Sequence, residues 1–116
     1  MRETNDREPT SPIPIGARLR EEVAGWPGVS LQPHRFGGIE FTVNGKEIGH
    51  AHGDYLVDLP LPKAARDEAL AAGMAVPHHV LPASNWVSVY LRTEADGENA
   101  FALLRLNYDR LVGRSG

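Results

Sequence analysis

The sequence predicts an α+β fold in which a mainly antiparallel sheet carries helices on one face. Asn44-Gly45 separates two runs of alternating polarity, residues 39–43 and 46–52. Asn-Gly is the preferred centre of a two-residue hairpin turn, because both positions need positive φ. Further strand-like runs follow after short connections, which favour antiparallel neighbours. Apolar residues at helical spacing near both ends of the chain predict helices that pack on the sheet.

The first elements are a short helix and an edge strand. Residues 16–25 predict a helix whose inner face carries Leu19 and Val23, four positions apart. Residues 29–36 predict a strand at the edge of the sheet, because Pro33 has no backbone N–H to donate to a ladder. The hairpin centred on Asn44-Gly45 then supplies the second and third strands.

The second half of the chain alternates between strands and helices. Residues 55–59 predict a fourth strand, residues 63–72 a helix that begins after prolines, and residues 76–81 an extended segment or loop. Residues 86–91 predict a last strand. A capping box, with Asp in place of the usual Glu, opens the final helix over residues 93–111. The order is α-β-β-β-β-α-(β)-β-α, and the return through the second helix leaves room for one parallel pair of strands.

Length and composition restrict the class of protein. The chain has 116 residues, enough for one domain, which we expect over residues 13–113 after a disordered polar tail at residues 1–12. The net charge of −3 argues against nucleic acid as a partner. No apolar run is long enough for a membrane span, and the first residues are too polar for a signal peptide. With no cysteine, these features lead us to expect a cytoplasmic protein.

The hairpin turn also predicts which side chains share a face. A regular two-residue turn would place Phe41 opposite Ile48, Ile39 opposite His50, and Gly37 opposite His52. Side chains alternate along a strand, so this register puts six of them on the side that covers the core: Ile39, Phe41, Val43, Ile48, His50 and His52. Two imidazoles on that face, one opposite a glycine, predict the floor of a pocket.

All five histidines fall between positions 34 and 79: His34, His50, His52, His78 and His79. A His-x-His pair on one strand face can bind zinc or iron, with His78 or His79 as a third ligand. The same imidazoles can serve as general bases without a metal, or can have a structural role in the core. We predict a site without metal or other cofactor.

Other polar and aromatic residues complete the prediction. Trp86 is a candidate wall for an aromatic ligand, although it also suits the core. Tyr108, on the inner face of the last helix, needs a partner for its hydroxyl group if it is buried. Asp58 should face away from its apolar neighbours and be solvated. Glu47 should fall on the face opposite His50 unless a β-bulge intervenes.

These residues in this order resemble the luciferase-domain family. The resemblance spans about residues 36–111 and is carried by Lys46-Glu-Ile-Gly-His-Ala-His52, His78-His79, Trp86 and Tyr108. The family takes its name from the luciferase of bioluminescent fungi, and its members include bacterial proteins. The fungal enzymes are longer, carry an apolar N-terminal segment, and have His-Pro where this chain has His78-His79. Both histidines are therefore candidates for the family's histidine.

The resemblance implies an activity. The fungal enzyme oxidises 3-hydroxyhispidin, a styryl-pyrone, with molecular oxygen and releases carbon dioxide and light. It implies an oxygenase-like enzyme acting on a small enolic or phenolic aromatic compound. Its expected catalytic residues are His50, His52 and His78, and its expected substrate-binding residues are His79, Trp86, Tyr108 and Ile39. A binding module without turnover is the alternative. The layout is also similar to small α+β domains of the YjbR type, for which DNA binding has been suggested, although the negative charge argues against it. The oligomeric state stays open.

Overall fold

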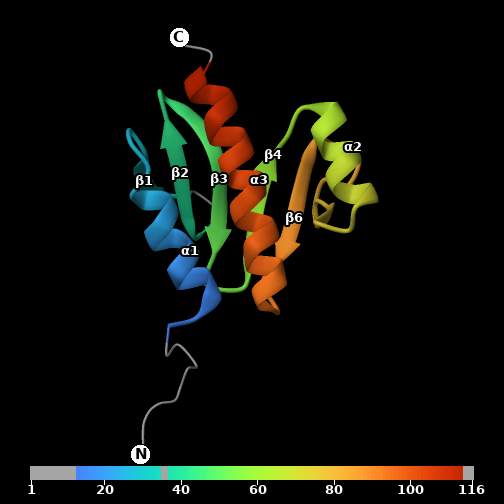
Figure 1. The fold of residues 1–116 in the computed structure, drawn as a ribbon, viewed down its shortest axis with the longest axis horizontal. Coiled ribbons are helices and arrows are strands. Elements are labelled where there is room, and N and C mark those ends of the chain that lie inside the picture. The colour runs from blue at the N-terminus through green and yellow to red at the C-terminus, as the bar shows by residue number, and fades with distance from the viewer. Residues whose placement is uncertain (1–12, 35–36, 114–116) are drawn as a thin grey trace, which may run out of the picture.

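Helices and strands form two layers in the computed structural model, which describes residues 13–34 and 37–113 (Figure 1). The α+β class and the order of elements are confirmed. The elements in chain order are α1 (Ile15–Ala24), β1 (Ser30–Pro33), β2 (Ile39–Val43), β3 (Lys46–His52), β4 (Leu56–Pro60), α2 (Lys63–Ala71), β5 (Val76–Pro77), β6 (Trp86–Tyr90) and α3 (Glu94–Gly113). The tail predicted at residues 1–12 lies outside the described residues.

The strands form one sheet in the order β1-β2-β3-β4-β6-β5, and each of its neighbouring pairs is antiparallel. A parallel pair was considered for the return after β4, and that expectation is wrong. After β4 the chain forms α2 and then β5, a strand of only two residues at the outer edge of the sheet. It turns back from there, so β6 enters beside β4 in the opposite direction.

Helices α1 and α3 cover the same face of the sheet, with α2 beyond the β6 side (Figure 1). Leu19 and Val23 of α1 are buried, as their spacing predicts, and α3 contributes Leu103 and Leu104 to the same core. The capping box of α3 is also confirmed. The Asp96 N–H donates to Thr93 Oγ1 at 3.1 Å, and the Thr93 N–H donates to Asp96 Oδ2 at 3.0 Å.

The hairpin has the predicted turn but not the predicted register. Asn44 and Gly45 both have positive φ, 54° and 76°, and Val43 pairs with Lys46. Thr42 then pairs with Glu47, whereas Phe41 pairs with Gly49 rather than with Ile48. Ile48 is thus an extra residue in β3, which makes a β-bulge.

The bulge reverses the predicted orientation of the histidines. Beyond it, Glu40 pairs with His50 and Ile39 pairs with Ala51, so His50 and His52 point away from the helices. Our prediction that they share the face of Phe41 is therefore wrong. One inserted residue moves each later side chain of a strand to the other face. Ile48 keeps its core position, so the apolar face is preserved while the histidines lie on the face opposite α1 and α3.

Candidate functional site

A histidine pocket opens on the face of the sheet that α1 and α3 leave uncovered. Its cavity of about 510 Å³ is lined by ten residues: His34, Glu47, His50, His52, Asp58, His78, His79, Val80, Leu81 and Trp86. Strands β3 and β4 provide the floor. The segment between β5 and β6 supplies His78, His79 and the exposed Val80 and Leu81, and β6 supplies Trp86. The five histidines of the chain therefore gather in one cavity.

The bulge in β3 positions the first part of this site. Because Ile48 is the extra residue, Glu47 and His50 emerge on the same face, and Glu47 Oε2 lies 2.7 Å from His50 Nδ1. A carboxylate only accepts hydrogen bonds, so His50 donates through Nδ1–H. On the helix side, the Asn107 amide donates to the Ile48 carbonyl at 2.8 Å. A fully buried side chain of α3 thus satisfies a backbone group at the bulge.

Asp58 lies at the centre of the pocket floor. It faces away from its neighbours Val57 and Leu59 as predicted, but it is fully buried rather than solvated. Strands β3 and β6 flank it, because Asp58 pairs with His50 on one side and with Ser88 on the other. The Ser88 hydroxyl donates to Asp58 Oδ1 at 2.6 Å.

The other oxygen of Asp58 faces imidazoles. Oδ2 lies 3.4 Å from the Nε2 atom of His50, 3.1 Å from that of His52, 3.3 Å from that of His78 and 3.0 Å from that of His79. Buried carboxylates are rare unless they are paired, and this one is surrounded by partners.

The charges of the cluster are coupled. Burial by itself lowers the pKa of His50, but hydrogen bonds to Asp58 and Glu47 outweigh it and raise the pKa to about 9. Burial opposes ionisation of Asp58, but hydrogen bonds from His50, Ser88 and His79 hold its pKa well below the usual value. In the protein alone, His50 is therefore an imidazolium between two carboxylates at neutral pH.

His78 differs from the other imidazoles of the cluster. Its Nδ1 atom accepts the backbone N–H groups of Val80 at 3.1 Å and Leu81 at 3.0 Å. Nδ1 therefore carries no proton, and the neutral ring must bear its proton on Nε2, which donates to Asp58. Burial lowers the pKa of His78 and outweighs the nearby charge of Asp58, consistent with a neutral ring. His78 orients Asp58 and has no free lone pair for a substrate proton.

The structure brings together five of the seven predicted site residues: His50, His52, His78, His79 and Trp86. Ile39 and Tyr108 lie elsewhere. Ile39 packs against the core on the helix side, paired with Ala51. The Tyr108 hydroxyl donates to the Pro27 carbonyl at 2.6 Å, and its ring packs on Trp26.

Five residues of the pocket were not among the predicted site residues: His34, Glu47, Asp58, Val80 and Leu81. Asp58 could have been recognised as a site residue because it is the one carboxylate in a mostly apolar strand. Burying a carboxylate there is costly unless it has partners. Glu47 was not predicted as a site residue because it faces the pocket only as a result of the bulge in β3. His34 follows β1 and stacks on His50 with ring centroids 3.9 Å apart.

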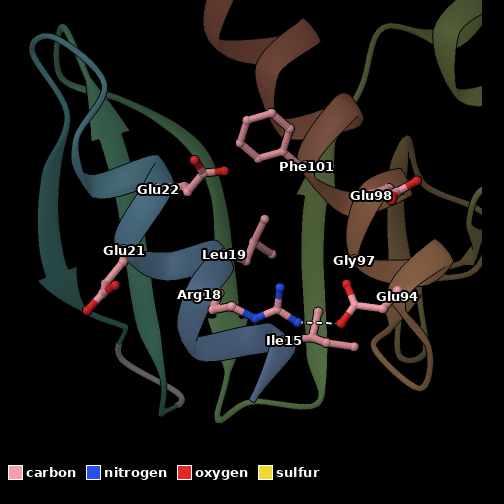
Figure 2. Close-up of a pocket in the computed structure, with 9 residues that line it drawn as sticks. All are labelled: Ile15, Arg18, Leu19, Glu21, Glu22, Glu94, Gly97, Glu98 and Phe101. Atoms are coloured by element: carbon pink, nitrogen blue, oxygen red, sulfur yellow. Dashed lines mark hydrogen bonds and ion pairs between the residues drawn. The ribbon is translucent and has the colours of Figure 1, made fainter. Parts of the chain in front are cut away.

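A second cavity of about 510 Å³ lies between α1 and α3 (Figure 2). An ion pair between Arg18 and Glu94 joins the two helices across it. Its remaining charged side chains are Glu21, Glu22 and Glu98. None of the predicted site residues lines it, so the histidine pocket is the candidate functional site.

Comparison with known families identifies one that matches this chain. A family model described as Luciferase domain matches residues 45–107, more than half of the chain. The chain belongs to the Luciferase domain family. Neither a curated protein nor a solved structure matches it.

The Luciferase domain match covers most of the histidine pocket. The matched residues run from the hairpin turn into α3 and include the clustered side chains from Glu47 to Trp86. His34 lies before the matched segment. Within the described residues of this Luciferase domain protein, no helix combines the length and apolar character needed to cross a membrane.

Proposed function

We propose that this Luciferase domain protein binds a planar enolic or phenolic compound in the histidine pocket and ionises its hydroxyl group for reaction with molecular oxygen. The observation that carries the proposal is the position of the imidazoles around Asp58 beside the ring of Trp86. The Trp86 ring lies 5.4 Å from the ring of His50. An aromatic compound stacked there would bring its hydroxyl group to the cluster.

Size and polarity of the cavity support a small aromatic ligand. Its volume of about 510 Å³ falls within the range of small-molecule sites, roughly 300–1,000 Å³. Val80 and Leu81 are exposed apolar residues at its rim, so a ligand would bury them. The proton of the hydroxyl group would pass to His52 or His79 at the floor, and the ring that receives it would hold positive charge beside the ionised hydroxyl group. An enolate donates electrons to oxygen more readily than its neutral form.

Binding of catechol, 3-hydroxy-2-pyrone and their O-methyl ethers tests the proposal. The hydroxyl compounds should bind with the absorbance of their anions at a pH where they are neutral in water. The ethers should show no such change. Trp86→Leu should weaken binding about tenfold, the value of a lost aromatic contact of roughly 1.4 kcal/mol. Tyr55→Leu is the matched control, because Tyr55 is exposed and outside the pocket.

Oxygen uptake decides between an enzyme and a binding module. Consumption of oxygen with the bound pyrone, reduced in Trp86→Leu but not in Tyr55→Leu, supports the proposal. Ionisation of the ligand without oxygen uptake would identify a binding module. If neither hydroxyl compound binds, the assignment of the pocket is wrong.

A further inference from the structure

We propose that His50, His52 and Asp58 form a binding site for one divalent transition-metal ion, with Nε2 of each histidine and Oδ2 of the aspartate as ligands. Each of these residues offers one ligand atom within 4.8 Å of those of the other two, and the Nε2 atoms of His50 and His52 lie 3.4 and 3.1 Å from Asp58 Oδ2. The proposal goes beyond the ionisation of an aromatic hydroxyl group, and metal binding can be measured with no aromatic compound present.

The first argument is the number of nitrogens around one oxygen. Four imidazole Nε2 atoms lie 3.0–3.4 Å from Asp58 Oδ2. A carboxylate offers about two lone-pair sites per oxygen, so Oδ2 cannot accept four good hydrogen bonds. Two ligands about 2.1 Å from one ion lie about 3.0 Å apart at a right angle and about 3.4 Å apart at the tetrahedral angle. The distances from Oδ2 to His50 (3.4 Å) and His52 (3.1 Å) fall within this range.

The second argument is the tautomer of His50. Its Nδ1–H donates to Glu47, which leaves the lone pair of Nε2 facing Asp58 Oδ2 when the ring is neutral. Two lone pairs that face each other in a buried place need a cation between them. A carboxylate on the far nitrogen of a metal-bound histidine is the usual support for such a ligand.

The third argument separates ligands from supporting residues. The Nδ1 atom of His78 accepts two backbone N–H groups, so Nε2 carries the proton and cannot bind a metal. His78 would instead donate to the coordinating oxygen of Asp58. Ser88 holds the other oxygen of the same carboxylate. Two donors thus hold Asp58 in place, as hydrogen bonds from neighbouring residues usually orient the ligands of a metal ion.

The donor set indicates the kind of ion. Two imidazoles and one carboxylate suit ferrous iron, zinc and their neighbours, whereas magnesium and calcium prefer oxygen ligands. Three protein ligands on the floor of an open cavity leave coordination positions facing the space lined by Trp86. A two-histidine, one-carboxylate set with open positions is the arrangement of non-haem iron oxygenases.

Cobalt(II) and zinc titrations of the chelator-treated full-length protein test the site. We expect about one equivalent of Co²⁺ to give visible d–d absorption bands, one equivalent of Zn²⁺ to remove them, and both ions to raise the melting temperature. His52→Ala should weaken Co²⁺ binding at least 100-fold. His52 is partly exposed, so this variant should fold, and circular dichroism would verify it.

His78→Asn provides the matched control. Asn can still accept the backbone N–H groups, and the variant removes a supporting residue rather than a ligand. It should keep the stoichiometry and the bands, with affinity lowered by about 10- to 100-fold. Absence of bands and of any melting shift in the wild type would overturn the proposal and leave a proton as the cation on His50. Equal Co²⁺ affinity in His52→Ala and wild type would do so as well.

Discussion

The bulge in β3 can be tested with one methyl group at Gly49. A Cβ added there would lie 2.9 Å from the Asp58 carbonyl oxygen, 2.9 Å from Leu104 Cδ2 and 2.9 Å from Leu59 Cβ. Two of these three neighbours belong to β4, one of them backbone, so the added carbon must push β4 away from β3. Overpacking of this kind costs roughly 1–3 kcal/mol.

The net effect of Gly49→Ala follows from two opposing terms. Replacing glycine lowers the entropy of the unfolded chain and stabilises by about 0.4–1 kcal/mol where the native backbone permits alanine. We therefore expect the free energy of unfolding to fall by about 1–2 kcal/mol. In a hairpin without the bulge, Gly49 would lie on the face opposite Phe41 and Ile48, and only the stabilising term would remain.

Urea unfolding followed by circular dichroism measures the difference. Gly113→Ala is the control, because nothing lies within 4 Å of a Cβ added at this glycine of α3. It should leave the free energy of unfolding unchanged or raise it by up to about 1 kcal/mol. A Gly49→Ala protein as stable as wild type, or more stable, would refute the close packing of β3 on β4 and with it the observed register.

Three other predictions concern the bulge, the charge on His50 and the cap of α3. Asn107→Ala should lower the free energy of unfolding by about 1–3 kcal/mol, because the buried Ile48 carbonyl loses its donor; urea unfolding would show it, and no loss would mean that water replaces the amide. In a chelator, stability should be greatest below pH 6.5 and should fall by about 3 kcal/mol as pH rises through about 9, because His50 has a raised pKa and loses its proton there. Glu47→Gln should make this fall smaller, and an unchanged pH profile would contradict the ion pair. Thr93→Ala should cost about 1 kcal/mol in thermal or urea melts through loss of the α3 cap, and an unchanged melt would mean that the cap contributes nothing.

The sequence carried the elements of the fold because each has a local cause. The Asn44-Gly45 turn needs only the backbone preferences of two residues, and the capping box of α3 needs only a threonine and an aspartate three positions apart. Prolines and glycines bounded the helices in the same way. The antiparallel entry of β6 had no local signal, because it depends on where the chain turns after α2.

The site was predicted less well because it depends on one non-local event. No pattern in residues 46–52 predicts that Ile48 is an extra residue. The bulge keeps Ile48 in the core and places its carbonyl near Asn107, 59 positions away in the chain. That choice also brings Glu47 beside His50. The burial of Asp58 likewise requires imidazoles from two separate segments. The clustering of the histidines in the sequence therefore correctly indicated that they lie together. The face of the sheet on which they lie could not be predicted from the sequence.

The sheet separates the packed core from the histidine pocket. Along β3 and β4, side chains alternate between the two faces of the sheet. Those on one face pack under α1 and α3, and those on the other face point toward the cavity. Variation at the cavity face therefore does not require the helices to repack. Substitutions at exposed rim positions such as Val80 and Leu81 would therefore change the lining of the pocket and leave the core intact. The same separation makes the bulge a sensitive point, because deleting Ile48 would move the side chains that follow it in β3 to the other face of the sheet.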